Sequence, residues 1–258
     1  MTTLERLYDA LAETSLPASL TAGLPDEALD LWLMSEPSVE LLASDLALCH
    51  PAPSAEEARA RAVSVDRLGS WRITVVTRDR PGLLADTTGV VASAGMAVTT
   101  ASALTFGPEP LALHSLTVSA PKLDEPRWVE LGGHIRAAAA GRVPRPAFEP
   151  AGVTEVSTTG QPGGLQLVTV SAPDQLGLLS AICGALADQS VSIEVAMVAG
   201  QARRAQDLFL VRGDVDVAEL ASRLSRTGRW RLAELAAQSV GRTPLVGPLL
   251  QKGLEAVI

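Results

Sequence analysis

The sequence contains one segment twice, and this repeat limits the folds that the chain can adopt. The first copy opens at Trp71 with WRITVVTRDRPGLLADTTGVVASAGMAVTTASALTFG, and the second opens at Gly164 with GLQLVTVSAPDQLGLLSAICGALADQSVSIEVAMVAG. The copies align without a gap, with matching residues 95 positions apart. The matched residues are Asp79, Gly82, Leu83, Leu84, Gly89, Ala92 and Ala101 in the first copy and Asp174, Gly177, Leu178, Leu179, Gly184, Ala187 and Ala196 in the second. Such a repeat predicts two similar units that bury surface against one another.

Each copy shows the same succession of strand and helix patterns. A β-rich run leads into an Asp-x-x-Gly corner, about a dozen residues with helical spacing, two alternating strands joined by a turn, and a second helix. The predicted strands are 73–77, 96–105 and 111–119 in the first copy and 165–171, 191–199 and 207–212 in the second. The predicted second helices are 125–140 and 215–225, followed by last strands at 142–149 and 229–235. The predicted order in each copy is therefore β-α-β-β-α-β.

This order predicts an α+β fold with two ferredoxin-like βαββαβ domains. We expect the first domain over 71–150, the second over 164–236, a helical N-terminal segment over 1–65 and a helical tail over 237–258. In the second copy the apolar residues Leu179, Ile182, Cys183 and Leu186 share one helix face, which we expect to cover a sheet. Two such units can lie side by side or face to face, and the groove between them is a candidate ligand site.

The connecting segments differ in character from the repeats. The sequence predicts Ser35 as a helix N-cap, with Pro37 in the first turn of a helix that runs towards Leu48. Residues 54–64 predict a short charged helix or a linker. Residues 151–163, which contain GQPGG, predict a loop between the two domains.

Composition excludes several classes of function. Twenty-nine acidic and 21 basic residues give a net charge of −8, and only 3% of residues are aromatic, so we expect no nucleic-acid partner. The apolar stretch 41–48 is interrupted by Ser44 and Asp45, and no segment predicts a membrane span. The N-terminus has no secretory pattern, and the two cysteines have no metal-ligand spacing, so we expect a cytoplasmic protein without a metal or other cofactor.

The repeated corner offers the chemistry of a binding site. In the first copy, Asp79 can cap helix amides, Pro81 suits a first turn and Gly82 allows close approach of a ligand. The amides at such a helix start favour an anion such as the carboxylate of an amino acid. The candidate ligand-binding residues are Asp79, Arg80, Pro81, Gly82, Leu83 and Leu84, with Asp174, Gln175, Gly177 and Leu178 in the second copy. Because Leu176 replaces Pro81 in the second copy, we expect the first corner to be the better site; a purely structural role for both corners stays open.

Other polar residues have simpler interpretations. Asp216 is expected to cap the following helix rather than to form a metal pair with Asp214. The three histidines share no ligand spacing, and Cys183 is expected to be a small buried apolar residue. No combination of residues predicts nucleophilic catalysis, so we expect no enzymatic activity.

Over roughly residues 71–235 the chain resembles tandem ACT domains, which are small amino-acid-sensing modules of metabolic control. The motifs TRDRPGLLADTTGVVASAGMAVTTASA and AQDLFLV (205–211) are most similar to the carboxy-terminal ACT pair of bacterial uridylyltransferase/uridylyl-removing enzymes, which modify the PII nitrogen-signal protein. The stretch LPDEALDLWLMSEPSVELLASDLALCH is similar to the segment that precedes that pair. The resemblance implies a free amino acid as ligand, with glutamine as the natural candidate, and a role in nitrogen metabolism.

The sequence departs from those enzymes where their chemistry would lie. Gly69 and Ser70 lead directly into the first ACT strand with no acidic pair behind them, and no His-Asp dipeptide is present. We therefore expect an allosteric regulator whose ligand-dependent packing acts on a protein partner through the N-terminal helices. Two alternatives stay open: an accessory or remnant of a PII uridylyltransferase system, and a ligand-free dimerisation scaffold. The identity of the partner and the formation of a homodimer also stay open.

Overall fold

The computed structural model describes Asp9 and residues 39–225, apart from 55, 66–68, 108, 121–122, 151, 153 and 202–203. The strands are β1 (Ala58–Ser64), β2 (Ser70–Arg78), β3 (Ala97–Phe106), β4 (Leu111–Ser119), β5 (Glu155–Gln161), β6 (Leu165–Pro173), β7 (Ser192–Gln201) and β8 (Arg204–Arg212). The helices are α4 (Val39–Leu46), α5 (Leu83–Ser93), α6 (Glu125–Ala139), α7 (Leu178–Asp188) and α8 (Val217–Leu224), with short 3₁₀ turns η1 (Ala47–Cys49) and η2 (Pro162–Gly164).

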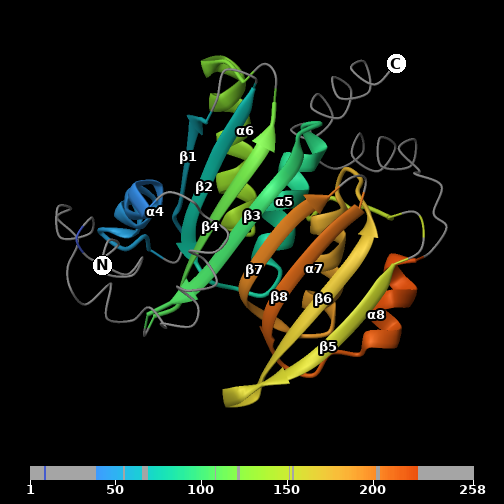
Figure 1. Ribbon diagram of the computed structural model, residues 1–258. Coiled ribbons are helices and arrows are strands. Elements are labelled where there is room, and N and C mark those ends of the chain that lie inside the picture. Colours follow the sequence, from blue (N-terminus) through green and yellow to red (C-terminus); the bar gives the residue numbers. More distant parts are fainter. Residues whose placement is uncertain are drawn as a thin grey trace.

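All eight strands form one antiparallel sheet in the order β1-β2-β4-β3-β7-β8-β6-β5. The first four strands belong to one repeat and the last four to the other, and the two repeats meet side by side at β3 and β7 (Figure 1). Helices α5, α6, α7 and α8 cover one face of this sheet (Figure 1). The expected fold class, an α+β protein with two ferredoxin-like repeats, is confirmed.

The register between β3 and β7 relates the repeats by a pseudo-twofold axis. Ser102 pairs with Met197, the residue that corresponds to it in the second repeat, and Thr100 pairs with Ala199. Leu104 pairs with Val195, so the pairing reads the same from either repeat. The two repeats therefore lie side by side in one sheet, with β3 and β7 antiparallel at its centre.

The outer strand of each repeat comes from a different segment than expected. The predicted last strand 142–149 forms no strand, whereas the predicted linker 54–64 contains β1 and the predicted loop 151–163 contains β5. Each described repeat therefore runs β-β-α-β-β-α, with the outer strand before the rest of the unit instead of after it. The predicted strand 229–235 and the tail 237–258 lie outside the described residues.

The residue types explain this correction. In β1, Ala58, Ala60 and Ala62 pack against the core on one face, while the alternate positions carry arginines. This alternation is typical of a half-buried strand, but the arginines make the segment resemble a charged linker in the sequence. Residues 142–149 include Pro144 and Pro146, which cannot donate to a strand ladder.

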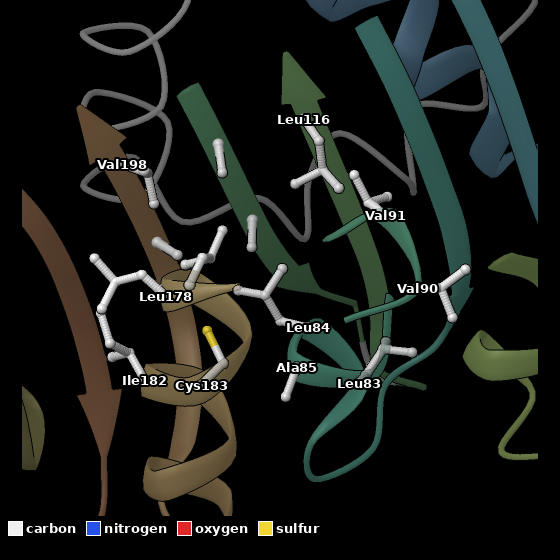
Figure 2. Packing of buried hydrophobic residues seen from close by; sticks show 14 of the residues in the cluster. Leu83, Leu84, Ala85, Val90, Val91, Leu116, Leu178, Ile182, Cys183 and Val198 are labelled. Carbon is white, nitrogen blue, oxygen red and sulfur yellow. The ribbon is translucent and has the colours of Figure 1, made fainter. Parts of the chain in front are cut away.

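One continuous hydrophobic core lies between the helices and the sheet. Leu83, Leu84, Val90 and Val91 from α5 and Leu178, Ile182 and Cys183 from α7 point into it, with Leu116 and Val198 on the strands (Figure 2). The expected buried face Leu179, Ile182, Cys183 and Leu186 is confirmed. Because the core crosses the boundary between the repeats, neither repeat buries its helix face alone.

The N-terminal helix α4 is fixed to the opposite face of the sheet through Asp45. This carboxylate is fully buried (0% exposed). It accepts hydrogen bonds from Arg72 Nη2 at 2.6 Å, Arg61 Nη2 at 2.7 Å, Thr74 Oγ1 at 2.6 Å and Ser115 Oγ at 2.8 Å. Since these partners lie on β1, β2 and β4, one side chain ties α4 to three strands of the first repeat.

We expect Asp45→Ala to lower the free energy of unfolding by about 3–5 kcal/mol, because it leaves the buried Arg72 guanidinium without its counter-charge. Urea unfolding measures this loss. Glu109→Ala is the control, since Glu109 pairs with Arg78 at 2.6 Å but is 78% exposed, and its loss should be below about 1 kcal/mol. Similar losses for both variants would contradict the anchoring role of Asp45.

Candidate functional site: two cavities between the repeats

Both corners have the same backbone geometry. Helix α5 begins at Leu83 after Gly82, which has φ 77°, and α7 begins at Leu178 after Gly177, which has φ 82°. Glycine suits these positions because other residues avoid positive φ. As the cap residue in both cases is glycine, no cap side chain is bonded to the first turn of either helix.

The expected capping role of Asp79 is wrong. Its carboxylate instead accepts hydrogen bonds from the backbone of Arg80 and the side chain of Thr105, and burial raises its pKa. Asp79 therefore holds the corner against β3, and the start of α5 has no side-chain cap, although its first amide, Leu83 N, donates to the Arg80 carbonyl at 3.2 Å. The expected cap at Asp216 is confirmed, since its Oδ1 accepts from the Glu219 amide at 2.9 Å.

A cavity of about 30 Å³ lies at the first corner, between the repeats. The six candidate residues of this corner, Asp79, Arg80, Pro81, Gly82, Leu83 and Leu84, all line it. The second repeat contributes the end of α7 and the start of β7, including Cys183, Ala187 and Ser192. The first repeat adds His114 from β4.

A second cavity of about 30 Å³ occupies the corresponding place at the other corner. The candidate residues Asp174, Gln175, Gly177 and Leu178 line it. The first repeat contributes Thr88, Ala92 and Ala97, which correspond to Cys183, Ala187 and Ser192 at the first cavity. The expected groove between the repeats is therefore two small cavities, each built by the corner of one repeat and by the helix end and strand start of the other.

Polar groups at the first cavity are already engaged. Arg80 turns to α6, donating to the Ala138 carbonyl at 2.6 Å, and pairs with Asp86 at 2.6 Å. His114 is 4% exposed, and its Nδ1 lies 3.3 Å from Thr87 Oγ1. Burial lowers the pKa of His114 to about 4, with a smaller contribution from Arg80, so the imidazole is neutral near pH 7.

Asp207 in β8 lines the second cavity and was not among the expected site residues. It is 1% exposed, and neither carboxylate oxygen has a hydrogen-bond partner within the described part of the chain. Burial, and then the nearby Asp174, raises the pKa of Asp207 to about 7. The sequence signal for Asp207 is its position in the alternating pattern of β8. In AQDLFLV, Asp207 shares the inward face with Ala205, Phe209 and Val211.

The connection after α6 crosses the helix layer between the two corners. We call residues 142–150 the strap. A Cβ added at Gly82 would overlap the Arg145 guanidinium, and one added at Gly177 would overlap the Phe148 ring. Arg145 Nε also binds Asp86 Oδ1 at 2.7 Å. The strap therefore covers the Cα of both corner glycines, so a ligand must approach each corner from the cavity side.

Across the described ranges, no three His, Cys, Asp or Glu side chains gather closely enough to hold a metal ion. A search of the same residues for an apolar helix long enough to cross a membrane finds none.

Comparison with models of protein families gives no match. A search of curated proteins also gives no match. Among solved structures, the chain is similar to aspartate kinase from Synechocystis, with 16% identity and a TM-score of 0.35 over 60% of this chain and 26% of the kinase chain. It is also similar to an unknown protein from Galdieria sulphuraria, with 16% identity and a TM-score of 0.22 over 55% of this chain and 80% of that one. At these values neither similarity supports a functional assignment, and the resemblance to PII uridylyltransferases stays a prediction from sequence motifs.

We expect Asp207→Asn to stabilise the protein, and to do so more at alkaline pH. The folded protein holds this proton more tightly than the unfolded chain, where an aspartate has a pKa of about 3.9. Native stability therefore falls as the pH rises from about 4 to 7, the pKa of Asp207 in the fold, because the charge must then be buried. The gain over wild type in urea unfolding should be about 3 kcal/mol larger at pH 8 than at pH 5. The exposed Asp214→Asn serves as control, and an equal pH dependence in both variants would contradict the buried charge.

We expect Gly177→Ala to destabilise the protein more than Gly163→Ala. Both glycines have positive φ, 82° and 73°, so both variants incur backbone strain of about 1–2 kcal/mol. A Cβ at Gly163 meets no neighbouring atom, whereas one at Gly177 must displace Phe148 of the strap, at an additional cost of about 1–3 kcal/mol. Thermal unfolding of the two variants measures the difference, and equal losses would show that the strap does not cover the corner.

Proposed function

We propose that this protein is a regulatory amino-acid sensor of the ACT type. A free amino acid binds in the cavities between the repeats, and glutamine is the first candidate because of the resemblance to PII uridylyltransferases. Binding changes the packing of the two repeats and thereby controls a protein partner in nitrogen metabolism. In this proposal the protein acts in the cytoplasm, in keeping with its two free, buried cysteines.

The observation that carries this proposal is the pair of corresponding cavities. Each combines a helix start without a side-chain cap in one repeat with the helix end and strand start of the other. Amides in the first turn of a helix have no intrahelical acceptor and favour a carboxylate. A ligand there touches both repeats at once, so its binding free energy depends on how they pack.

The ligand's binding free energy depends strongly on how the repeats pack, because α5 and α7 are closely packed. The helices approach through small residues, and Ser180 Oγ donates to the Ala85 carbonyl of the other repeat at 2.8 Å. A Cβ at Gly89 would lie 2.9 Å from Ser180 Oγ, so the helices have no room to move closer. A ligand that prefers one arrangement of this contact shifts the population, whereas one that binds both arrangements equally does not.

A route from the first cavity to the N-terminal helix runs through two strands. His114 faces the cavity from β4, and the next residue, Ser115, binds Asp45 of α4 on the other face of the sheet. Strand β2, which carries Arg72 and Thr74, ends at the corner that forms the cavity. We therefore propose α4 as the part of the protein that passes the signal to the partner.

We also propose a regulatory rather than a catalytic role for the cavities. Burial raises the pKa of the Cys183 thiol well above its usual value, so this thiol is a poor nucleophile. His114 is neutral, and its Nδ1 lies beside the Thr87 hydroxyl. Neither group has the activation that nucleophilic catalysis requires.

A thermal-shift screen of the twenty amino acids tests the proposal. A ligand that binds only the native state adds about 2.7 kcal/mol at one hundred times its dissociation constant. We expect glutamine or a related amino acid to raise the melting temperature. The absence of a shift for all twenty would reject amino-acid sensing.

Two corresponding variants locate the binding. Ser192 lines the first cavity and Ala97 the second, at equivalent positions of exposed strand starts. We expect Ser192→Phe to block the first cavity and Ala97→Phe the second, with little effect on stability because both positions are exposed. A ligand shift unchanged in both variants would place binding elsewhere.

A further inference from the structure

The two cavities differ in charge. At the second cavity, Asp207 is buried and unpartnered, and Asp174 lies at the corner beside it. In the first repeat Asp207 corresponds to His114, because Val170 and Val198 flank Asp207 in the sheet as Val75 and Ala103 flank His114. Gln175 corresponds to Arg80. The first corner therefore has a basic residue where the second has none, and the second has an additional carboxylate.

The surroundings of Asp207 provide no counter-charge. Its neighbours in the sheet are Val170 on β6 and Val198 on β7. Cys183 of α7 and the corner residue Asp174 are the titratable groups whose charges couple to it. No Arg, Lys or His is among the described residues that line the cavity. An ionised carboxylate in such a place is costly unless a cation joins it.

We propose that the second cavity binds a small ligand through a primary ammonium group, with Asp207 as the ion-pair partner of that ammonium. The ammonium donates hydrogen bonds to the two carboxylate oxygens that have no other partner. For an amino-acid ligand, the ammonium site rests on the proposed function, because it specifies which group of that ligand the second corner recognises. A simple primary amine carries the same chemistry.

The size of the cavity agrees with this assignment. A volume of about 30 Å³ accommodates about two water-sized groups, which suits an ammonium and one adjoining carbon. The rest of a larger ligand must lie towards the mouth, where Leu176 is 37% exposed. At this corner an amino acid can place its ammonium at Asp207 and its carboxylate near the first turn of α7.

Titration with four compounds tests the proposal on the full chain at pH 8. Methylammonium chloride, glycine, sodium propionate and potassium chloride are compared at equal ionic strength by thermal shift. Methylammonium should stabilise the protein, and Asp207→Asn should weaken its binding at least tenfold, whereas the exposed control Asp214→Asn should not. Ala97→Phe, which fills the same cavity without changing charge, should also abolish the effect.

The pH dependence of methylammonium binding distinguishes an ion pair at Asp207 from a purely structural role of this residue. A primary ammonium stays charged below pH 9, while Asp207 loses its charge below about pH 7. Binding of methylammonium should therefore weaken at least tenfold from pH 8 to pH 5 in wild type and stay constant in Asp207→Asn.

The outcomes separate this inference from the proposed function. A shift with methylammonium that depends on Asp207, without one for any amino acid, supports the ammonium site and rejects amino-acid sensing. A shift with amino acids that is unchanged in Asp207→Asn and Ala97→Phe overturns the ammonium site alone. An equal shift with potassium chloride, or a shift with propionate that Asp207→Asn abolishes, also overturns it.

Discussion

The hydrogen bonding between β3 and β7 determines most of what this protein can do. Because Ser102 pairs with its own counterpart Met197, the two repeats are related by a twofold axis through the sheet. That axis places the start of each central helix beside the end of the other, with Ala187 of α7 near Gly82 of α5. Both cavities arise from this arrangement, and a register shift by one residue would turn the side chains of one repeat to the wrong face.

The close approach of α5 and α7 requires small residues in the helix layer. Gly89, Ser180 and Gly184 lie where the two helices and the strap meet, and larger side chains would separate them. The strap itself binds both helices, since Arg145 pairs with Asp86 of α5 at 2.7 Å and with Asp188 of α7 at 3.8 Å. The connection between the repeats is therefore part of their interface, and any change in packing must also move the strap.

The sequence predicted the central part of each repeat well. The repeat, the corners and the strands that carry β-branched alternation were clear, and residues 111–119 match β4 over its full length. The outer strands were missed because Arg59 and Arg61 give β1 the charge of a linker, although its alanines alternate inward. The sequence predicts a strand over the proline-rich residues 142–149 because a ferredoxin-like unit usually ends with one.

The candidate site was predicted in outline. All ten expected ligand-binding residues line the two cavities, since a glycine corner at a strand end fixes where a helix begins. Asp207 and the residues contributed by the opposite repeat could not be found in this way. Asp207 lies in the same repeat as its corner, and only its inward position in β8 signals it in the sequence. The residues contributed by the opposite repeat depend on the side-by-side pairing of the repeats, which nothing within a single repeat specifies. The same holds for the strap, whose position follows from the antiparallel packing of α5 and α7.

The placement of the outer strand first in each repeat determines the order in which the strands become available for folding during synthesis. The first repeat has all its strands and both its helices once Ala139 has been synthesised, while the strand that pairs with β3 begins only at Ser192. Domains fold as they emerge from the ribosome, N-terminal part first. The nascent first repeat therefore exposes an unpaired strand edge for the time needed to add about fifty residues, and an open edge can recruit a strand from a neighbouring nascent chain. We therefore expect rapid translation of this interval to favour pairing within one molecule over exchange of repeats between two.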